Sequence, residues 1–158
     1  MKFQTTKSFM RYILIFSVLL LSTTAIVAQD QVNLKGGYAA EGYDVVAYFQ
    51  NDVQKGNKEI SATHEGVNYK FHSVENLETF QKNPAMYVPQ YGGFCAYAVA
   101  KNGEKVGVNP KTYTISDGKL YLFYNSWGVN TLEKWNEEGA ETLQKKADVQ
   151  WQQILKAL

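Results

Sequence analysis

Cys95 is the only cysteine of this sequence, and its thiol offers the widest range of chemistry. A thiolate is both a nucleophile and a metal ligand, and reactive thiols need solvent access and an electropositive surrounding. Gly92 and Gly93 precede Cys95, and the backbone N–H groups of such a pair at a helix start could form a nest for the sulfur. This pattern allows catalytic redox chemistry at Cys95. A buried and inert cysteine is the alternative.

The number of cysteines limits that chemistry. With no second thiol to resolve an oxidised sulfur, a two-thiol oxidoreductase is excluded. A one-cysteine thiol or peroxide cycle would depend on a small external redox partner.

Metal binding is the competing hypothesis, with Cys95, His64 and His72 as candidate ligands. A soft thiolate beside imidazole suits copper or zinc. The two histidines lie eight residues apart and no pair has a diagnostic spacing, so two surface histidines are the alternative.

Two further residues are candidates for supporting roles. Asp44 interrupts an apolar run, where it is either a site carboxylate or, as we favour, a side chain that bonds to its own backbone in a turn. Tyr91, just before the glycine pair, could donate a hydrogen bond to whatever Cys95 binds, or simply pack.

The elements that must position these residues alternate between strands and helices. The sequence predicts strands over residues 43–49 and 67–71, a helix capped by Ser73 that continues to residue 82, and a hairpin whose turn contains Asp117 and Gly118. Residues 94–100 are ambiguous between helix and strand.

The C-terminal third is predicted to be helical. A short helix at residues 132–137 is followed by a longer one from about residue 140, with one apolar stripe made of Leu143, Ala147, Trp151, Ile154, Leu155 and Leu158. The predicted fold class is α+β: a small antiparallel sheet with short helices, and a C-terminal amphipathic helix packed on it.

Residues 1–28 have the three parts of a secretory signal peptide. Lys2, Lys7 and Arg11 precede an apolar run at residues 12–21, and small residues follow up to Ala28. We expect cleavage after Ala28, with cleavage after residue 25 or an uncleaved anchor as alternatives. The sequence predicts an exported protein, periplasmic or extracellular, with one domain over residues 29–158 and no membrane span after cleavage.

Cleavage would change the charge of the chain. The 16 basic residues of the full sequence include the three in the signal peptide, and all 15 acidic residues follow it, so the mature chain has a net charge of −2. Arg11 is the only arginine. Since nucleic-acid surfaces are basic and favour arginine, we expect no nucleic-acid partner.

The pattern Tyr69-x-Phe71-x-Ser73, followed by Phe80, Pro84 and Tyr87, resembles a YHS domain, a small metal-associated fold. Metal-binding members of that family have cysteines in the positions of His72 and Asn76. The segments at residues 42–49, 90–96 and 118–125 are similar to a secreted bacterial group of YHS proteins. Some members of that group carry selenocysteine at the position of Cys95. The resemblance covers residues 36–152 and implies metal binding or redox chemistry at Cys95.

Overall fold

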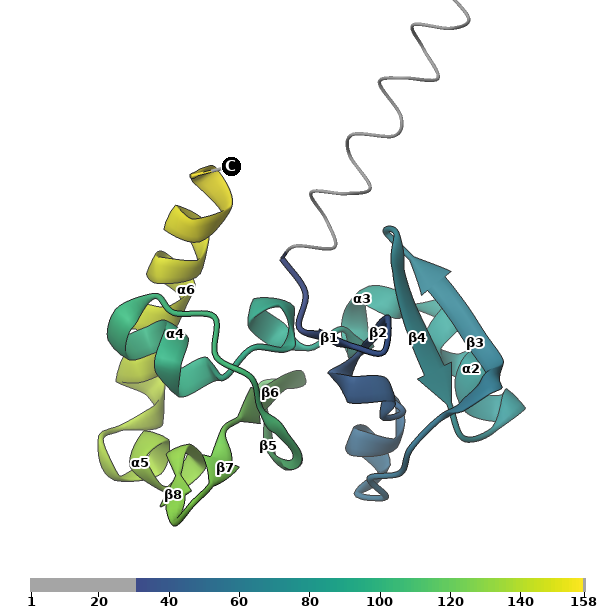
Figure 1. Cartoon of the computed structure of the whole chain (residues 1–158), viewed down its shortest axis with the longest axis horizontal. Helices are drawn as coiled ribbons and strands as arrows, with labels where there is room; N and C mark the ends of the chain where they lie inside the picture. Colours follow the sequence, from purple (N-terminus) through teal and green to yellow (C-terminus); the bar gives the residue numbers. More distant parts are fainter. Residues whose placement is uncertain (1–30, 158) are drawn as a thin grey trace, which may run out of the picture.

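The computed structural model describes residues 31–157, and it confirms the α+β fold class (Figure 1). A four-stranded sheet with the helices of residues 74–87 occupies one side of the molecule, and the helices of residues 96–156 occupy the other. A hairpin of residues 109–123 lies between them (Figure 1). Within residues 31–157, none of the helices combines the length and apolar character that crossing a bilayer requires.

The four-stranded sheet has the order β1-β2-β4-β3. Only β2 and β4 run parallel, and the other neighbours are antiparallel. Its strands are β1 (Leu34–Lys35), β2 (Tyr38–Ala39), β3 (Asn57–His64) and β4 (Val67–Phe71). In β4 the buried positions are Val67, Tyr69 and Phe71, which confirms the predicted alternating strand.

The helix predicted after Ser73 is also confirmed. α2 spans Val74–Lys82, and the Ser73 hydroxyl accepts a hydrogen bond from the Asn76 backbone N–H at 3.1 Å. This N-cap satisfies one of the free donors of the first helical turn. A second short helix, α3 (Pro84–Tyr87), begins at proline, whose fixed φ suits a first helical position.

The strand predicted over residues 43–49 is wrong. The segment makes an isolated bridge at Tyr43 and then turns into a 3-10 helix, η2 (Ala47–Gln50); another, η1 (Ala40–Gly42), precedes it. The β-branched and aromatic composition favoured a strand. The Asp44 side chain decides otherwise, because it takes up backbone donors that a strand would give to a neighbour.

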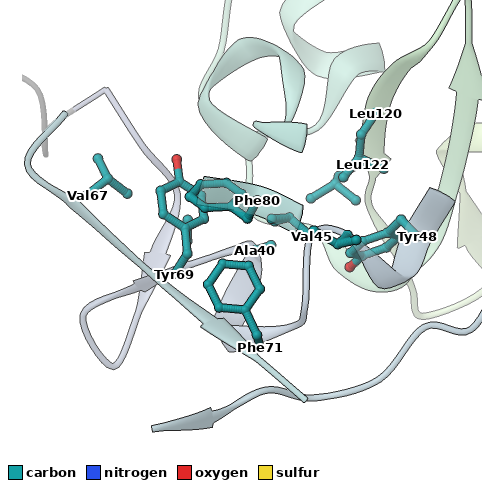
Figure 2. Packing of buried hydrophobic residues seen from close by; sticks show 11 residues of the cluster. Ala40, Val45, Tyr48, Val67, Tyr69, Phe71, Phe80, Leu120 and Leu122 are labelled. Carbon is teal, nitrogen blue, oxygen red and sulfur yellow. The ribbon is translucent and has the colours of Figure 1, made fainter. Parts of the chain in front are cut away.

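The predicted hairpin is confirmed as β5 (Asn109–Ser116) and β6 (Lys119–Phe123). Side chains of β6 alternate between two cores. Leu120 and Leu122 enter the core beside the four-stranded sheet, where Figure 2 shows them close to Val45 and Tyr48. On the opposite face of β6, Tyr121 and Phe123 enter the helical core. β6 therefore joins the two halves of the molecule.

The helical side resolves the ambiguity of residues 94–100, because α4 spans Ala96–Asn102 after a third 3-10 helix, η3 (Gln90–Gly93). A small hairpin of β7 (Asn125–Ser126) and β8 (Val129–Asn130) leads into α5 (Thr131–Glu137). The C-terminal helix, α6 (Ala140–Lys156), lies along α4 and buries Leu143 and Ala147 with Tyr121 of β6. Trp151 is half-buried against the same core.

Candidate functional site

Asp44 is fully buried and lies three residues before η2 begins. Its Oδ1 accepts hydrogen bonds from the backbone N–H groups of Val46 at 2.9 Å and Ala47 at 3.3 Å. These two bonds turn the chain out of an extended path and begin the 3-10 helix. The interpretation of Asp44 as a turn-forming residue is confirmed.

The second oxygen of the same carboxylate binds His72, at the junction of β4 and α2. Asp44 Oδ2 accepts a bond from the His72 backbone N–H at 2.9 Å, and lies 2.7 Å from His72 Nδ1. It also accepts a bond from Asn76 Nδ2 at 2.8 Å. Asp44 thus holds the start of the 3-10 helix, and the structure brings it together with His72.

The contact with the Asp44 carboxylate determines which ring nitrogen of His72 carries the proton. Asn76 uses its two N–H donors on Asp44 and on Gln50 Oε1 (3.3 Å), while Gln50 Nε2 donates to Asn76 Oδ1 at 3.0 Å. Asn76 Nδ2 also lies 3.3 Å from His72 Nδ1. Because a carboxylate oxygen can only accept, the shorter 2.7 Å contact with Asp44 places the proton on His72 Nδ1.

When the ring is neutral, this assignment leaves Nε2 with a lone pair. Within residues 31–157, Nε2 of His72 has no hydrogen bond, and 27% of the side chain is exposed to solvent. A carboxylate that holds one imidazole nitrogen fixes the ring orientation and makes the other nitrogen a better ligand. The arrangement can bind a metal ion or accept a proton at Nε2.

Cys95 lies elsewhere, fully buried just before α4. Its sulfur accepts a hydrogen bond from the Tyr124 backbone N–H at 3.3 Å and lies 3.3 Å from Thr131 Oγ1. Since the Thr131 hydroxyl donates to the Tyr124 carbonyl at 2.8 Å, the thiol proton is the donor in the Cys95–Thr131 contact. The thiol therefore ties α4, β6 and α5 together.

The glycine pair before Cys95 does not form the predicted nest. The sulfur accepts its hydrogen bond from the Tyr124 N–H, and its thiol donates to Thr131. Gly92 and Gly93 instead present their carbonyls to Asn33, at 2.8 Å from its backbone nitrogen and 3.1 Å from its Nδ2. The glycines fasten the N-terminal segment to the body of the molecule.

Tyr91 is also directed away from the thiol. Its hydroxyl donates to Asp148 Oδ1 of α6 at 2.9 Å. Burial, followed by the hydrogen bond to the Asp148 carboxylate, raises the pKa of Tyr91 well above its ordinary value. Its role is to join η3 to α6.

His64 belongs to neither neighbourhood. It ends β3, and its ring meets Phe80 edge-on, with 6.0 Å between the ring centroids. Across residues 31–157, no three histidine, cysteine, aspartate or glutamate side chains come together as a metal site. Cys95, His64 and His72 therefore do not form one coordination sphere.

Sequence reasoning missed Asn76, Gln50, Tyr124 and Thr131. The position of Asn76 could have been predicted, because it lies four residues after His72 and three after the N-cap Ser73. This spacing places Asn76 in the first helical turn, beside the histidine. Gln50 and Thr131 gave no such signal, since only the tertiary fold brings them to Asp44 and Cys95.

None of the family models, curated proteins or solved structures with which the chain was compared matches it.

Proposed function

We propose that the protein is an exported YHS-like binding domain that offers the Nε2 atom of His72 to a transition metal ion, copper or zinc. One observation carries the proposal: a fully buried carboxylate holds His72 Nδ1 at 2.7 Å, while Nε2 has no hydrogen bond in the described part of the chain. The resemblance to a metal-associated family, whose cysteines occupy the positions of His72 and Asn76, supports the same location.

The donor set fits a single-ligand contact better than a closed metal cage. His72 supplies one imidazole, and the described residues place no further pair of ligands beside it. Zinc in proteins usually has three or four protein ligands. We therefore propose that the metal arrives with other ligands attached, held by a small chelator or a carrier, and that His72 fills an open position.

The burial of Cys95 makes it a weaker candidate than His72. Its sulfur is fully buried and both its donor and acceptor capacities are used within the core. A thiol or peroxide cycle would require this region to open first. We infer that Cys95 stabilises the fold.

Metal-chelate binding tests the proposal, because the chain has only two histidines. Copper(II) iminodiacetate, a complex with open coordination positions, is titrated into the wild-type protein, His72→Ala and His64→Ala, with binding followed by calorimetry. Binding that is lost in His72→Ala and retained in His64→Ala is expected. Equal affinities in all three proteins, or loss only in His64→Ala, would contradict the proposal.

A second comparison separates a supported histidine from any exposed one. Removing the carboxylate partner of a ligand histidine typically weakens metal binding by about 10–100-fold. Asp44→Asn, checked for folding by circular dichroism, should show a loss of this size, and Cys95→Ser should show none. An unchanged affinity in Asp44→Asn would mean that the chelate binds an ordinary surface imidazole.

The export part of the proposal rests on residues 1–28, which lie outside the described residues. Expressed with its full sequence in a bacterium, the chain should leave the cytoplasm and lose residues 1–28, so that Gln29 becomes the first residue. Intact-mass analysis of the recovered protein checks this. Full-length protein retained in the membrane fraction would support an uncleaved anchor instead.

A further inference from the structure

Trp127 is 95% exposed, the highest value among the large apolar side chains of residues 31–157. It forms the two-residue turn of the β7–β8 hairpin with Gly128, and both have left-handed backbone, with φ of 53° and 76°. Asn and Gly are the usual residues in such turns. A bulky side chain there adds backbone strain and gains no packing within the described chain, which points to a role outside the fold.

The hairpin that carries Trp127 is firmly attached at its base. Asn125 Nδ2 donates to Thr112 Oγ1 at 3.1 Å, and the Asn125 carbonyl accepts a bond from Asn109 Nδ2 at 3.4 Å. On the other strand, Asn130 Oδ1 accepts from the Leu132 N–H at 3.1 Å and caps α5. Because the base of the hairpin is fixed, the Trp127 indole loses little conformational entropy when it binds a partner.

A cavity of about 410 Å³ opens between the β5–β6 hairpin, α5 and the start of α6. Two buried aromatic residues, Tyr121 and Trp135, are among those that line it. Asp117 and Glu141 also line it, and Glu141 pairs with Lys145 at 2.6 Å. An indole has an apolar body and a single N–H donor, so the aromatic and acceptor groups of this cavity match both parts of it.

The hairpin and the cavity share one face of β5. Thr112 anchors the hairpin and Thr114 lines the cavity, and residues two apart in a strand point to the same side. Tyr113, which lies between them, packs against the core on the opposite side. A two-fold axis next to this face can bring each Trp127 to the cavity of the other molecule.

We propose that two copies of the chain associate through this face, the indole of Trp127 in each copy entering the cavity of the other. Each indole buries about 150–250 Å², and two insertions give less than the roughly 1,600 Å² of a standard stable interface. The dimer is therefore weak and depends on concentration. The inference is independent of His72.

The composition of the β7–β8 hairpin argues against a membrane as the binding partner of Trp127. Residues 125–130 contain no charged side chain, and only Trp127 and Val129 are exposed apolar residues. Peripheral membrane binding usually combines a broad apolar face with lysine or arginine. Insertion into a cavity of a second copy requires only one aromatic side chain, which Trp127 supplies.

Sedimentation velocity at concentrations up to about 1 mM tests the proposal, since contacts of millimolar affinity become populated there. Trp127→Ala removes the anchor, and Asn136→Trp fills the cavity from an exposed position on α5. Each variant alone should associate at least about tenfold more weakly than wild type. Val149→Ala is the control, because Val149 is also an exposed apolar residue but lies on α6, and this variant should associate as wild type does.

Mixing the variants gives the sharpest result. Trp127→Ala retains the cavity and Asn136→Trp retains the anchor, so one of the two contacts forms between unlike molecules, and the mixture should associate more than either variant alone. A wild-type protein that stays monomeric, or a mixture no better than its components, overturns the proposal. Trp127-dependent binding to vesicles of phosphatidylcholine and phosphatidylglycerol without self-association would assign the tip to a membrane and also overturn it.

Discussion

Around Asp44, one carboxylate meets the needs of three separate segments. It receives backbone donors from η2, the backbone and ring of His72, and the amide of Asn76. An ionised carboxylate can accept all of these bonds, because it has only acceptor sites. An amide at the same position would present donors to groups that are themselves donors.

Replacing Asp44 tests this network. Asp44→Asn should lower the free energy of unfolding by about 2–4 kcal/mol, since charge-assisted bonds are lost and buried donors remain unpaired. Asp52→Asn is the matched control, because the Asp52 carboxylate bonds only an exposed glutamine, Gln54. Urea denaturation measures both. Similar midpoints for the two variants would show that the network contributes little.

At Cys95, the prediction concerns reactivity. Because the sulfur is buried and bonded to Tyr124 and Thr131, the thiol should react with Ellman's reagent only as the protein unfolds. The rate in native buffer should become independent of reagent concentration once unfolding limits it. Rapid, stoichiometric reaction with the native protein would return Cys95 to the candidates for chemistry.

At the scale of elements, the N-terminal segment and η3 make the closest backbone contact that a substitution can probe. A Cβ atom on Gly92 would lie 1.9 Å from the Gln31 carbonyl oxygen, and Gly92 has a φ of +60°. Gly36 has almost the same φ, +59°, but open space around it. Comparing alanine substitutions at Gly92 and Gly36 therefore separates the cost of backbone strain from the cost of steric overlap.

Gly36→Ala should cost about 1–2 kcal/mol, the ordinary penalty of left-handed backbone. Gly92→Ala should cost about 1–3 kcal/mol more, because the new methyl group must displace the N-terminal segment. Thermal and urea unfolding of the two variants measure the difference. Equal costs would show that the segment moves away without loss.

The elements also show what local sequence determines. Ser73, Asp117 and Gly118 correctly indicated a helix start and a hairpin, because caps and tight turns depend on neighbouring residues. Residues 43–49 misled, since strand-like composition could not reveal that Asp44 bends the chain. The candidate site was predicted only in part, because the pairing of Asp44 with His72 crosses 28 positions and required the fold.

At the scale of the whole molecule, both cores contain buried tyrosines, which make stability sensitive to high pH. Burial, followed by the charge of Glu65, raises the pKa of Tyr69 to about 12. Burial, with smaller contributions from Asp148 and Asp117, raises the pKa of Tyr121 to about 12. Burial also raises the pKa of Tyr48 well above its ordinary value.

A group whose pKa is raised by folding stabilises the folded state fully below its unfolded pKa, which for tyrosine is about 10. That contribution is lost as the pH rises from about 10 through about 12. The free energy of unfolding should therefore fall across this interval, and tyrosinate absorbance should appear together with unfolding. Tyr69→Phe should reduce the dependence on pH. Tyrosine ionisation complete near pH 10 in a folded protein would contradict the account.

The central claim, that Nε2 of His72 is the group offered to a metal, is tested most directly by nitrogen NMR of the two histidine rings during a zinc titration. Without zinc, His72 should show a protonated Nδ1 and an unprotonated Nε2. On adding zinc, the Nε2 resonance of His72 should shift while Nδ1 keeps its proton and the ring of His64 stays unchanged. A free His72 ring with its proton on Nε2, or a zinc response confined to His64, would contradict the account.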